Sequence, residues 1–144
     1  MYKIYVRPHL EYCVQAWNPV YSGDIKLMEK VQDRFTKMLR HGPVLSPRER
    51  NEILNITDHR TRRLRGDLIH IYKLLSYESL FTPVRDPRTR GHDKKLEVPQ
   101  ARNNIRGHSF AARNIAAWNR LPNNVVNSRN LDVFKANIDE FLQI

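Results

Sequence analysis

Helix start and stop signals divide the chain into segments whose apolar residues recur every three or four positions. Of all the features of the sequence, this helical spacing restricts the possible folds most strongly. The clearest segment starts at Ser22 and is followed by Gly42 and Pro43, a pair that typically ends a helix. Its outward face alternates basic and acidic residues, which is typical of an ordinary solvated surface. Its predicted apolar stripe consists of Ile25, Met28, Val31, Phe35, Met38 and Leu39.

Further helix starts follow along the chain. The predicted helices, each with its N-cap, are 46–55 (Ser46, with a capping box to Glu49), 57–75 (Thr57), 109–121 (Ser109) and a last helix from Ser128 or Asn130. Residues 76–107 lack a helical period and are interrupted by proline and glycine, although 96–99 could form a short strand. The sequence therefore predicts an all-α fold, with five to six helices around one core and an irregular basic insert near 80–107.

The first helix, predicted over residues 2–17, begins on apolar residues without a capping residue in front of it. Pro8 lies inside this segment, so either the helix kinks there or Pro8 begins a second helical piece. Asn18 and Pro19 end it. A helix start of this kind is expected of a chain cut from something larger, with a partner surface missing at its N-terminus.

The charge of the chain is concentrated in its middle. The whole sequence has 25 Lys and Arg against 15 Asp and Glu, a net charge of +10. Most of that excess lies between residues 57 and 113, and most of these cations are arginines, whose planar fork suits phosphate. A polyanionic partner, nucleic acid, is therefore predicted; the alternative is a solubilising surface on a basic protein.

Two segments carry the candidate binding residues, the first half of the 57–75 helix and the insert that follows it. Leu64, Leu68, Ile71 and Leu75 share one face of the helix, which predicts that the arginines beside them fan out toward solvent. Several of these arginines could instead pair with Asp67, Asp86 or Asp93 inside the fold. The predicted phosphate-binding residues are Arg60, Arg62, Arg63, Arg65, Arg88, Arg90, Lys94 and Lys95.

Other functional classes have little support in the residues. The single cysteine, Cys13, excludes an internal disulfide framework, and an intracellular protein of the nucleus or cytoplasm is the simpler expectation. His9 and Cys13 form only half of a zinc site, and no second pair exists. We expect no metal, no cofactor, no catalytic residues and no membrane span. Trp17 and Trp118 lie on apolar stripes, which favours core packing over base stacking.

Five motifs follow one another in an order that resembles one protein family. They are VRPHLEYC at 6–13 with Trp17 and Pro19, LMEKVQDRFTKM at 27–38, RRLRGDLI at 62–69, RTRGH at 88–92, and WNRLP at 118–122 with Phe134 and Lys135. In this order the chain resembles the region after the polymerase palm in reverse transcriptases of non-LTR (LINE-type) retrotransposons, particularly the CR1- and jockey-like branch. Each motif alone is weak, and together they span nearly the whole chain.

The resemblance implies a thumb-like helical part at 1–56, followed by the basic helix, the loop and C-terminal helices at 57–144, in one continuous domain. The palm of such polymerases holds its catalytic metals on an Asp-Asp pair, and this sequence contains no such dipeptide; the endonuclease is absent too. We therefore expect a non-catalytic fragment of an RNA-directed DNA polymerase that binds RNA, an RNA–DNA hybrid or duplex DNA, with the palm of a related element as a further partner. The alternatives are a helical protein-interaction module, or an element remnant without function.

Overall fold

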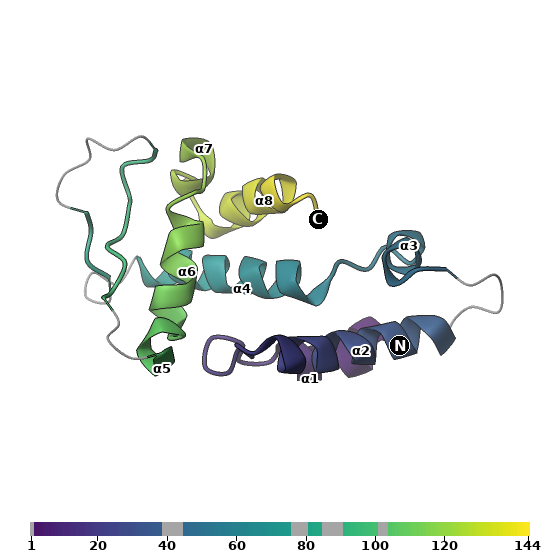
Figure 1. The fold of residues 1–144 in the computed structure, drawn as a ribbon. Helices are drawn as coiled ribbons and strands as arrows, with labels where there is room; N and C mark the ends of the chain where they lie inside the picture. The colour runs from purple at the N-terminus through teal and green to yellow at the C-terminus, as the bar shows by residue number, and fades with distance from the viewer. Residues whose placement is uncertain (1, 39–44, 76–80, 85–90, 101–103) are drawn as a thin grey trace. The chain divides into compact units, whose positions relative to one another are not determined.

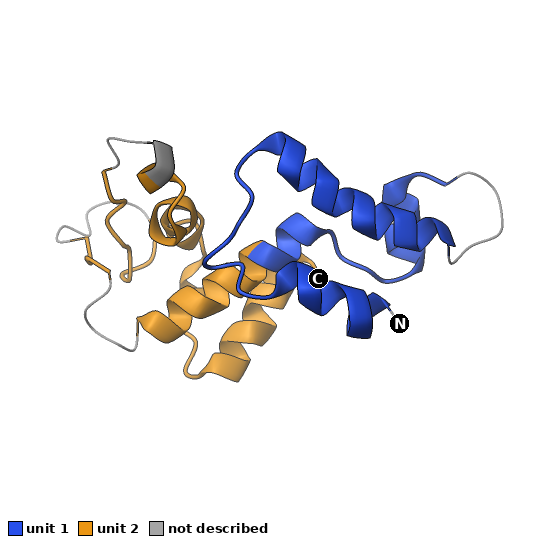
Figure 2. Ribbon diagram, turned by 90° about the horizontal axis from the view of Figure 1, so that it is seen from below, with its two compact units in different colours: residues 1–63 blue, residues 64–144 orange. Residues whose placement is uncertain are grey.

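The computed structural model describes residues 2–38, 45–75, 81–84, 91–100 and 104–144. It groups the chain into two compact units, unit 1 (Met1–Arg63) and unit 2 (Leu64–Ile144), which are coloured separately in Figure 2. The division falls inside a continuous helix, whereas the sequence predicts a boundary after residue 56. Each unit is described by itself below.

The prediction of an all-α fold is confirmed. Unit 1 contains a π-helical turn over Tyr2–Val6, α1 (Arg7–Glu11), α2 (Ser22–Met38) and α3 (Pro47–Ile53), and α4 (His59–Leu74) starts in it (Figure 1). No strand occurs among the described residues, where the only β contact outside helices is an isolated antiparallel bridge between Pro83 and Leu96.

The N-terminal segment forms two helical pieces, the second of the two possibilities left open by Pro8. The π-helical turn ends at Val6, and α1 carries proline in its first turn, where the missing N–H has no helical partner in any case. The continuous helix predicted to residue 17 is wrong. The chain instead leaves the helix after Glu11 and forms turns, with Cys13 at a positive φ of 52°.

The capping signals of unit 1 are realised with one shift. The Ser46 side chain accepts a hydrogen bond from the Glu49 backbone, and the Glu49 carboxylate accepts one from the Ser46 backbone at 2.7 Å, so the predicted capping box forms. The cap of α4 lies one residue later than predicted. The Asp58 carboxylate, not the Thr57 hydroxyl, accepts from the Thr61 backbone N–H, at 3.1 Å.

Unit 2 adds short helices to those the sequence predicted. Its elements after α4 are α5 (Asn104–Gly107), α6 (Phe110–Trp118), α7 (Asn123–Val126) and α8 (Leu131–Leu142). Ser109 caps α6 as predicted, and of the two candidates for the last helix it is Asn130 that caps α8, accepting from the Val133 backbone at 2.9 Å.

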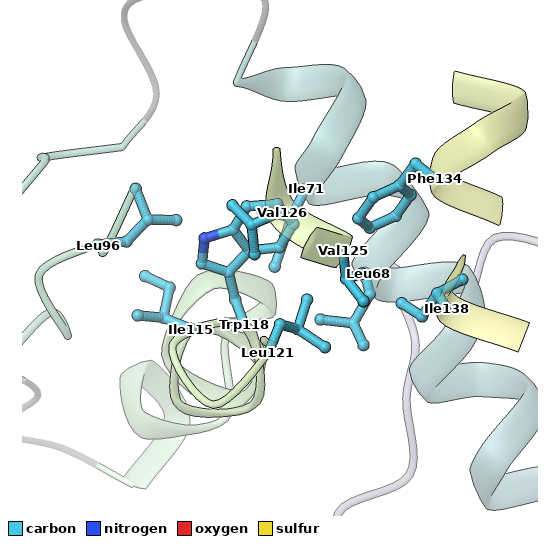
Figure 3. Packing of buried hydrophobic residues seen from close by; sticks show 10 residues of the cluster. All are labelled: Leu68, Ile71, Leu96, Ile115, Trp118, Leu121, Val125, Val126, Phe134 and Ile138. Carbon is cyan, nitrogen blue, oxygen red and sulfur yellow. The ribbon is translucent and has the colours of Figure 1, made fainter. Parts of the chain in front are cut away.

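The apolar core of the described residues lies in unit 2. Trp118 and Phe134 are completely buried, and Tyr72 stacks on Phe134 with ring centroids 4.2 Å apart. The predicted α4 stripe takes part, since Leu68 and Ile71 are buried and Leu64 and Leu75 pack against the cluster. The cluster in Figure 3 is made of Leu68, Ile71, Leu96, Ile115, Trp118, Leu121, Val125, Val126, Phe134 and Ile138.

All the described residues of this apolar core belong to unit 2, and the helices before α4 contribute none of them. The side chains that α2 buries are Gln32 and Thr36, whereas Val31 and Met38 of its predicted apolar stripe are exposed. Gln32 and Thr36 lie on the inner face because they bond to polar groups of neighbouring segments, which compensates the loss of water. The end of the predicted helix at Gly42 lies outside the described residues.

None of the helices described combines the length and the apolar composition that crossing a bilayer requires.

Candidate nucleic-acid interface

The first half of α4 does not present its arginines to solvent as predicted. Arg60 is exposed, but Arg62 and Arg63 are only 6% and 7% exposed. The expectation that both fan out around an exposed side is wrong. The physical reason is that Arg62 meets a carboxylate within unit 1, and Arg63 meets an aromatic ring and a side-chain oxygen there.

Arg62 is held by a network that joins the N-terminal helices to α2 and α4. Its Nε donates to the Glu11 carboxylate, which also accepts from Arg7 Nε at 2.9 Å. Its Nη2 donates to Gln32 Oε1 at 2.9 Å and reaches His59 Nδ1 at 3.0 Å. A charged group used in this way is a structural centre of unit 1, and at 6% exposure it lies out of reach of a phosphate.

His59 is the neutral partner in the same network. The Tyr2 hydroxyl donates to Gln32 Oε1 at 2.9 Å, so its oxygen is left to accept from His59 Nε2 at 3.1 Å. His59 Nδ1 then accepts from Arg62, and this tautomer uses both ring nitrogens. Burial, followed by the nearby Arg62 charge, lowers the pKa of His59 to about 4.

Arg63 is engaged by the segment before α2. Its guanidinium carbon lies 5.5 Å from the centre of the Trp17 ring, and its Nη1 is 3.5 Å from Asn18 Oδ1. Its Nη2 also contacts the Met28 sulfur. Trp17 itself is 41% exposed, so the prediction that it packs in a core is wrong, whereas the same prediction for Trp118 is confirmed.

Arginines in unit 2 also have internal partners. Arg65 forms a two-pronged pair with Asp139 of α8, with Nη2 to Oδ2 at 2.8 Å, and hydrogen bonding to that carboxylate raises the pKa of Arg65. Asp67, which the sequence offered as a partner for nearby arginines, pairs with Arg113 at 3.3 Å. Burial raises the pKa of Asp67 despite this partner.

The described part of the insert is pinned to the end of α6. The Trp118 indole donates to the Lys94 carbonyl at 2.9 Å, and the Asn119 side chain forms two hydrogen bonds with the Leu96 backbone, at 2.8 and 2.9 Å. His92 is buried and its Nε2 lies 3.0 Å from the Trp118 carbonyl. The first two residues of the WNRLP motif thus fix the residues that follow RTRGH.

With the backbone held by these hydrogen bonds, Lys94 is exposed and Lys95 is half-buried, and the Lys95 side chain lies over Gly91. Gly91 has a positive φ of 129°, a backbone conformation that favours glycine. Arg88 and Arg90 lie outside the described residues. Of the eight predicted phosphate-binding residues, Arg60 in unit 1 and Lys94 in unit 2 are therefore those that the described structure leaves exposed.

A different row of cations lies along α2, on the face whose alternating charges in the sequence are typical of an ordinary solvated surface. Lys26, Lys30 and Arg34 recur every four residues, so they lie about 6 Å apart along one side of the helix. All three are exposed, and none forms an ion pair with a described residue. We call these three residues the α2 cation row.

One acidic residue of α2, Asp33, is held by other cations and does not neutralise this row. Asp33 points away from it, because its carboxylate pairs with Arg50 and with Lys37, the latter at 2.9 Å. The hydrogen bond from Lys37, together with Arg50, lowers the pKa of Asp33. The alternation of basic and acidic residues in the sequence suggested a balanced face. Asp33 is instead engaged by Lys37 and by Arg50, and the second of these is 17 residues away in sequence.

Within the described ranges, no group of three or more His, Cys, Asp or Glu side chains is placed to hold a metal ion. Comparison with known proteins gave no match to a family model, to a curated protein or to a solved structure.

Proposed function

We propose that the chain is a non-catalytic part of a non-LTR retrotransposon reverse transcriptase and that it binds the sugar–phosphate backbone of nucleic acid through the α2 cation row. The order of the five motifs supports the ancestry, and the net charge of +10 supports a polyanionic partner. The observation that carries the binding site is the exposure of Lys26, Lys30 and Arg34 without an ion-pair partner among the described residues.

Backbone contacts of this kind position a nucleic acid without reading its sequence, because phosphates are the same at every step. Each neutralised phosphate releases counterions, so binding weakens as salt is added. Arg62 and Arg63 are unsuitable for testing this surface, since their removal would disturb the interior of unit 1. The α2 cation row can be removed without touching a buried contact.

The test compares two triple variants of the full chain that lose the same charge. One is Lys26→Gln, Lys30→Gln, Arg34→Gln. The matched control changes Lys73, Arg120 and Arg129 of unit 2 to Gln, three exposed cations that form no ion pair with a described residue. Binding to a labelled RNA–DNA hybrid and to a labelled single-stranded RNA is measured by anisotropy between about 50 and 200 mM salt. We expect the α2 variant to lose affinity and its log–log salt slope to shrink by about 2 to 3, and the control to change little.

Equal losses in the two variants would show that net charge, and not this row, attracts nucleic acid. Absence of binding by the unmodified chain at low salt would remove the proposed function.

A second function, a helical protein-interaction module, is favoured by a separate observation on α2. Leu27, Val31 and Met38 are exposed at 60%, 41% and 73%, and their spacing puts them in one row beside the cations. The polymerase palm of a related element is the proposed partner. Mixing the chain with such a palm should give a complex on size exclusion, and Leu27→Asn with Val31→Asn should abolish it while leaving nucleic-acid binding unchanged.

A further inference from the structure

The loop between α1 and α2 exposes three large aromatic side chains. Tyr12 and Tyr21 are 77% and 76% exposed, and Trp17 between them is 41% exposed. The loop is ordered by its own backbone, since the Ala16 and Trp17 N–H groups both donate to the Cys13 carbonyl, at 2.9 and 3.2 Å. These aromatic residues are therefore held on an ordered turn, at the surface of unit 1.

Trp17 is fixed in orientation although much of its ring remains in water. Its indole N–H donates to the Tyr12 carbonyl, which satisfies the only polar atom of the side chain. The Arg63 guanidinium lies against the ring at 5.5 Å and supports it from the protein side. The other tryptophan, Trp118, is completely buried, so the exposure of Trp17 is particular to its position in the loop.

We propose that Trp17 is a stacking platform for an unpaired base, so that the nucleic acid bound by unit 1 is single-stranded. This inference rests on the proposed function of the α2 cation row, and it names the class of nucleic acid that the row binds. A flat aromatic ring with an exposed face stacks on any base, whereas the faces of paired bases in a duplex are covered by their neighbours.

Continuity along the chain supports the assignment. Tyr21 directly precedes α2, which begins at Ser22 and carries the cation row one turn further on. Aromatic side chains followed by evenly spaced cations are the combination with which proteins hold single strands, one group contacting the bases and the other the phosphates. Tyr12 and Tyr21 lie on either side of Trp17 in sequence and offer further rings to adjacent bases.

The experiment uses Trp17 fluorescence in the full-length chain. Because the chain contains two tryptophans, Trp118→Phe leaves Trp17 as the only reporter, with circular dichroism confirming that this variant stays folded. A labelled single-stranded RNA oligonucleotide and the matching duplex are titrated at the same salt, with anisotropy reporting binding. We expect tighter binding to the single strand and quenching of Trp17 fluorescence by the single strand alone.

Two substitutions at Trp17 distinguish stacking from a structural role. Trp17→Ala should weaken single-strand binding roughly 5- to 150-fold, the range for one base stacked on an aromatic ring. Trp17→Phe keeps an aromatic face but loses the N–H bond to Tyr12, and it should stay within a few-fold of the unmodified chain. An equal loss in the two variants would overturn the stacking role.

The remaining outcomes separate this inference from the function it rests on. Saturating anisotropy without Trp17 quenching, or equal affinity for strand and duplex, overturns the stacking platform and leaves the α2 cation row as the binding site. No anisotropy change with either nucleic acid at low salt overturns both.

Discussion

Unit 1 and unit 2 have interiors of different chemistry. The interior of unit 1 is a network of hydrogen-bonded polar side chains around Gln32, His59 and Arg62, whereas unit 2 has an apolar cluster around Trp118 and Phe134. Of the twelve large apolar residues that the described structure leaves exposed, nine belong to unit 1. Unit 1 thus places polar groups inside and apolar groups outside to an extent that unit 2 does not.

The difference indicates where binding functions belong in this molecule. A polar network fixes a single arrangement through directional bonds but contributes little net stability, because each bond replaces one to water. Exposed apolar side chains in contiguous rows are typical of surfaces that meet another molecule. Unit 2 therefore has the character of a stable packing unit, and unit 1 that of a unit shaped for contact.

The largest expected effect on stability comes from replacing the one described tryptophan of each unit by alanine. Trp118→Ala should lower the free energy of unfolding by about 3–5 kcal/mol, since it empties a fully packed site and removes the bond to the Lys94 carbonyl. Trp17→Ala should cost less than about 1.5 kcal/mol, because its ring is already partly in water. Urea unfolding followed by circular dichroism measures both. Equal losses would contradict the contrast between the units.

Acidification should act in opposite directions through two buried groups, His59 in unit 1 and Asp67 in unit 2. The folded pKa of His59, about 4, lies below the ordinary value of 6.5, so folding favours the neutral ring. Its contribution is complete above pH 6.5 and is lost as the pH falls toward 4, at most about 3 kcal/mol. Asp67 in unit 2 has a raised pKa, so its protonated form is favoured by folding and acid relieves the cost of burying its charge.

The measurement is the NMR titration of His59 together with unfolding free energies between pH 7 and pH 4. Unit 1 resonances should lose protection from hydrogen exchange before those of unit 2 as the pH falls. His59→Gln should remove most of the pH dependence of unit 1. A His59 pKa near 6.5 would show that the ring is not enclosed by the network.

Arg62 and Arg60 offer a test on a single helix. Arg62→Met should lower the free energy of unfolding by about 1–3 kcal/mol, because His59 Nδ1 and Gln32 Oε1 both lose the hydrogen bond that Arg62 donates. The Glu11 carboxylate would still accept a hydrogen bond from Arg7. It should also bring the pKa of His59 upward by removing a nearby positive charge. Arg60→Met, exposed on the same helix, should stay within about 0.5 kcal/mol.

If the two substitutions cost the same, Arg62 would be a surface residue as the sequence predicted. If the His59 pKa is the same in Arg62→Met as in the unmodified chain, the arginine does not interact with the histidine. The network described above would then be wrong.

The interior of unit 2 could be predicted from the sequence better than the interior of unit 1. Helix caps and apolar periodicity are local signals, and they correctly predicted Ser46, Ser109 and the buried stripe with Leu68 and Ile71. The polar interior of unit 1 depends on contacts between residues as distant as Glu11 and Arg62, which no local pattern encodes. The arginines of α4 therefore predicted an exposed basic surface, whereas in the structure three of them have partners inside the fold.

The candidate site was hidden for a related reason. The α2 face looked balanced because Glu29 and Asp33 alternate with lysines in the sequence. Which carboxylate remains beside the cations is decided by Arg50, a residue that packs against α2 from the next helix. A charge pattern thus predicts net attraction for a polyanion, but it does not predict which cations remain unpaired.

The smallest expected effect concerns the pair between Arg65 and Asp139. Both side chains are about one-third exposed, so water screens their attraction, and Asp139→Asn should cost no more than about 1 kcal/mol. The control is Asp132→Asn on the same helix, whose pair with Lys135 is more exposed and should contribute almost nothing. Both unfolding free energies are measured at low and moderate salt, where only the Asp139 difference should shrink noticeably. A loss of several kcal/mol would mean that unit 2 depends on this partly exposed ion pair as strongly as on its apolar cluster, and the contrast between the two interiors would then be weakened.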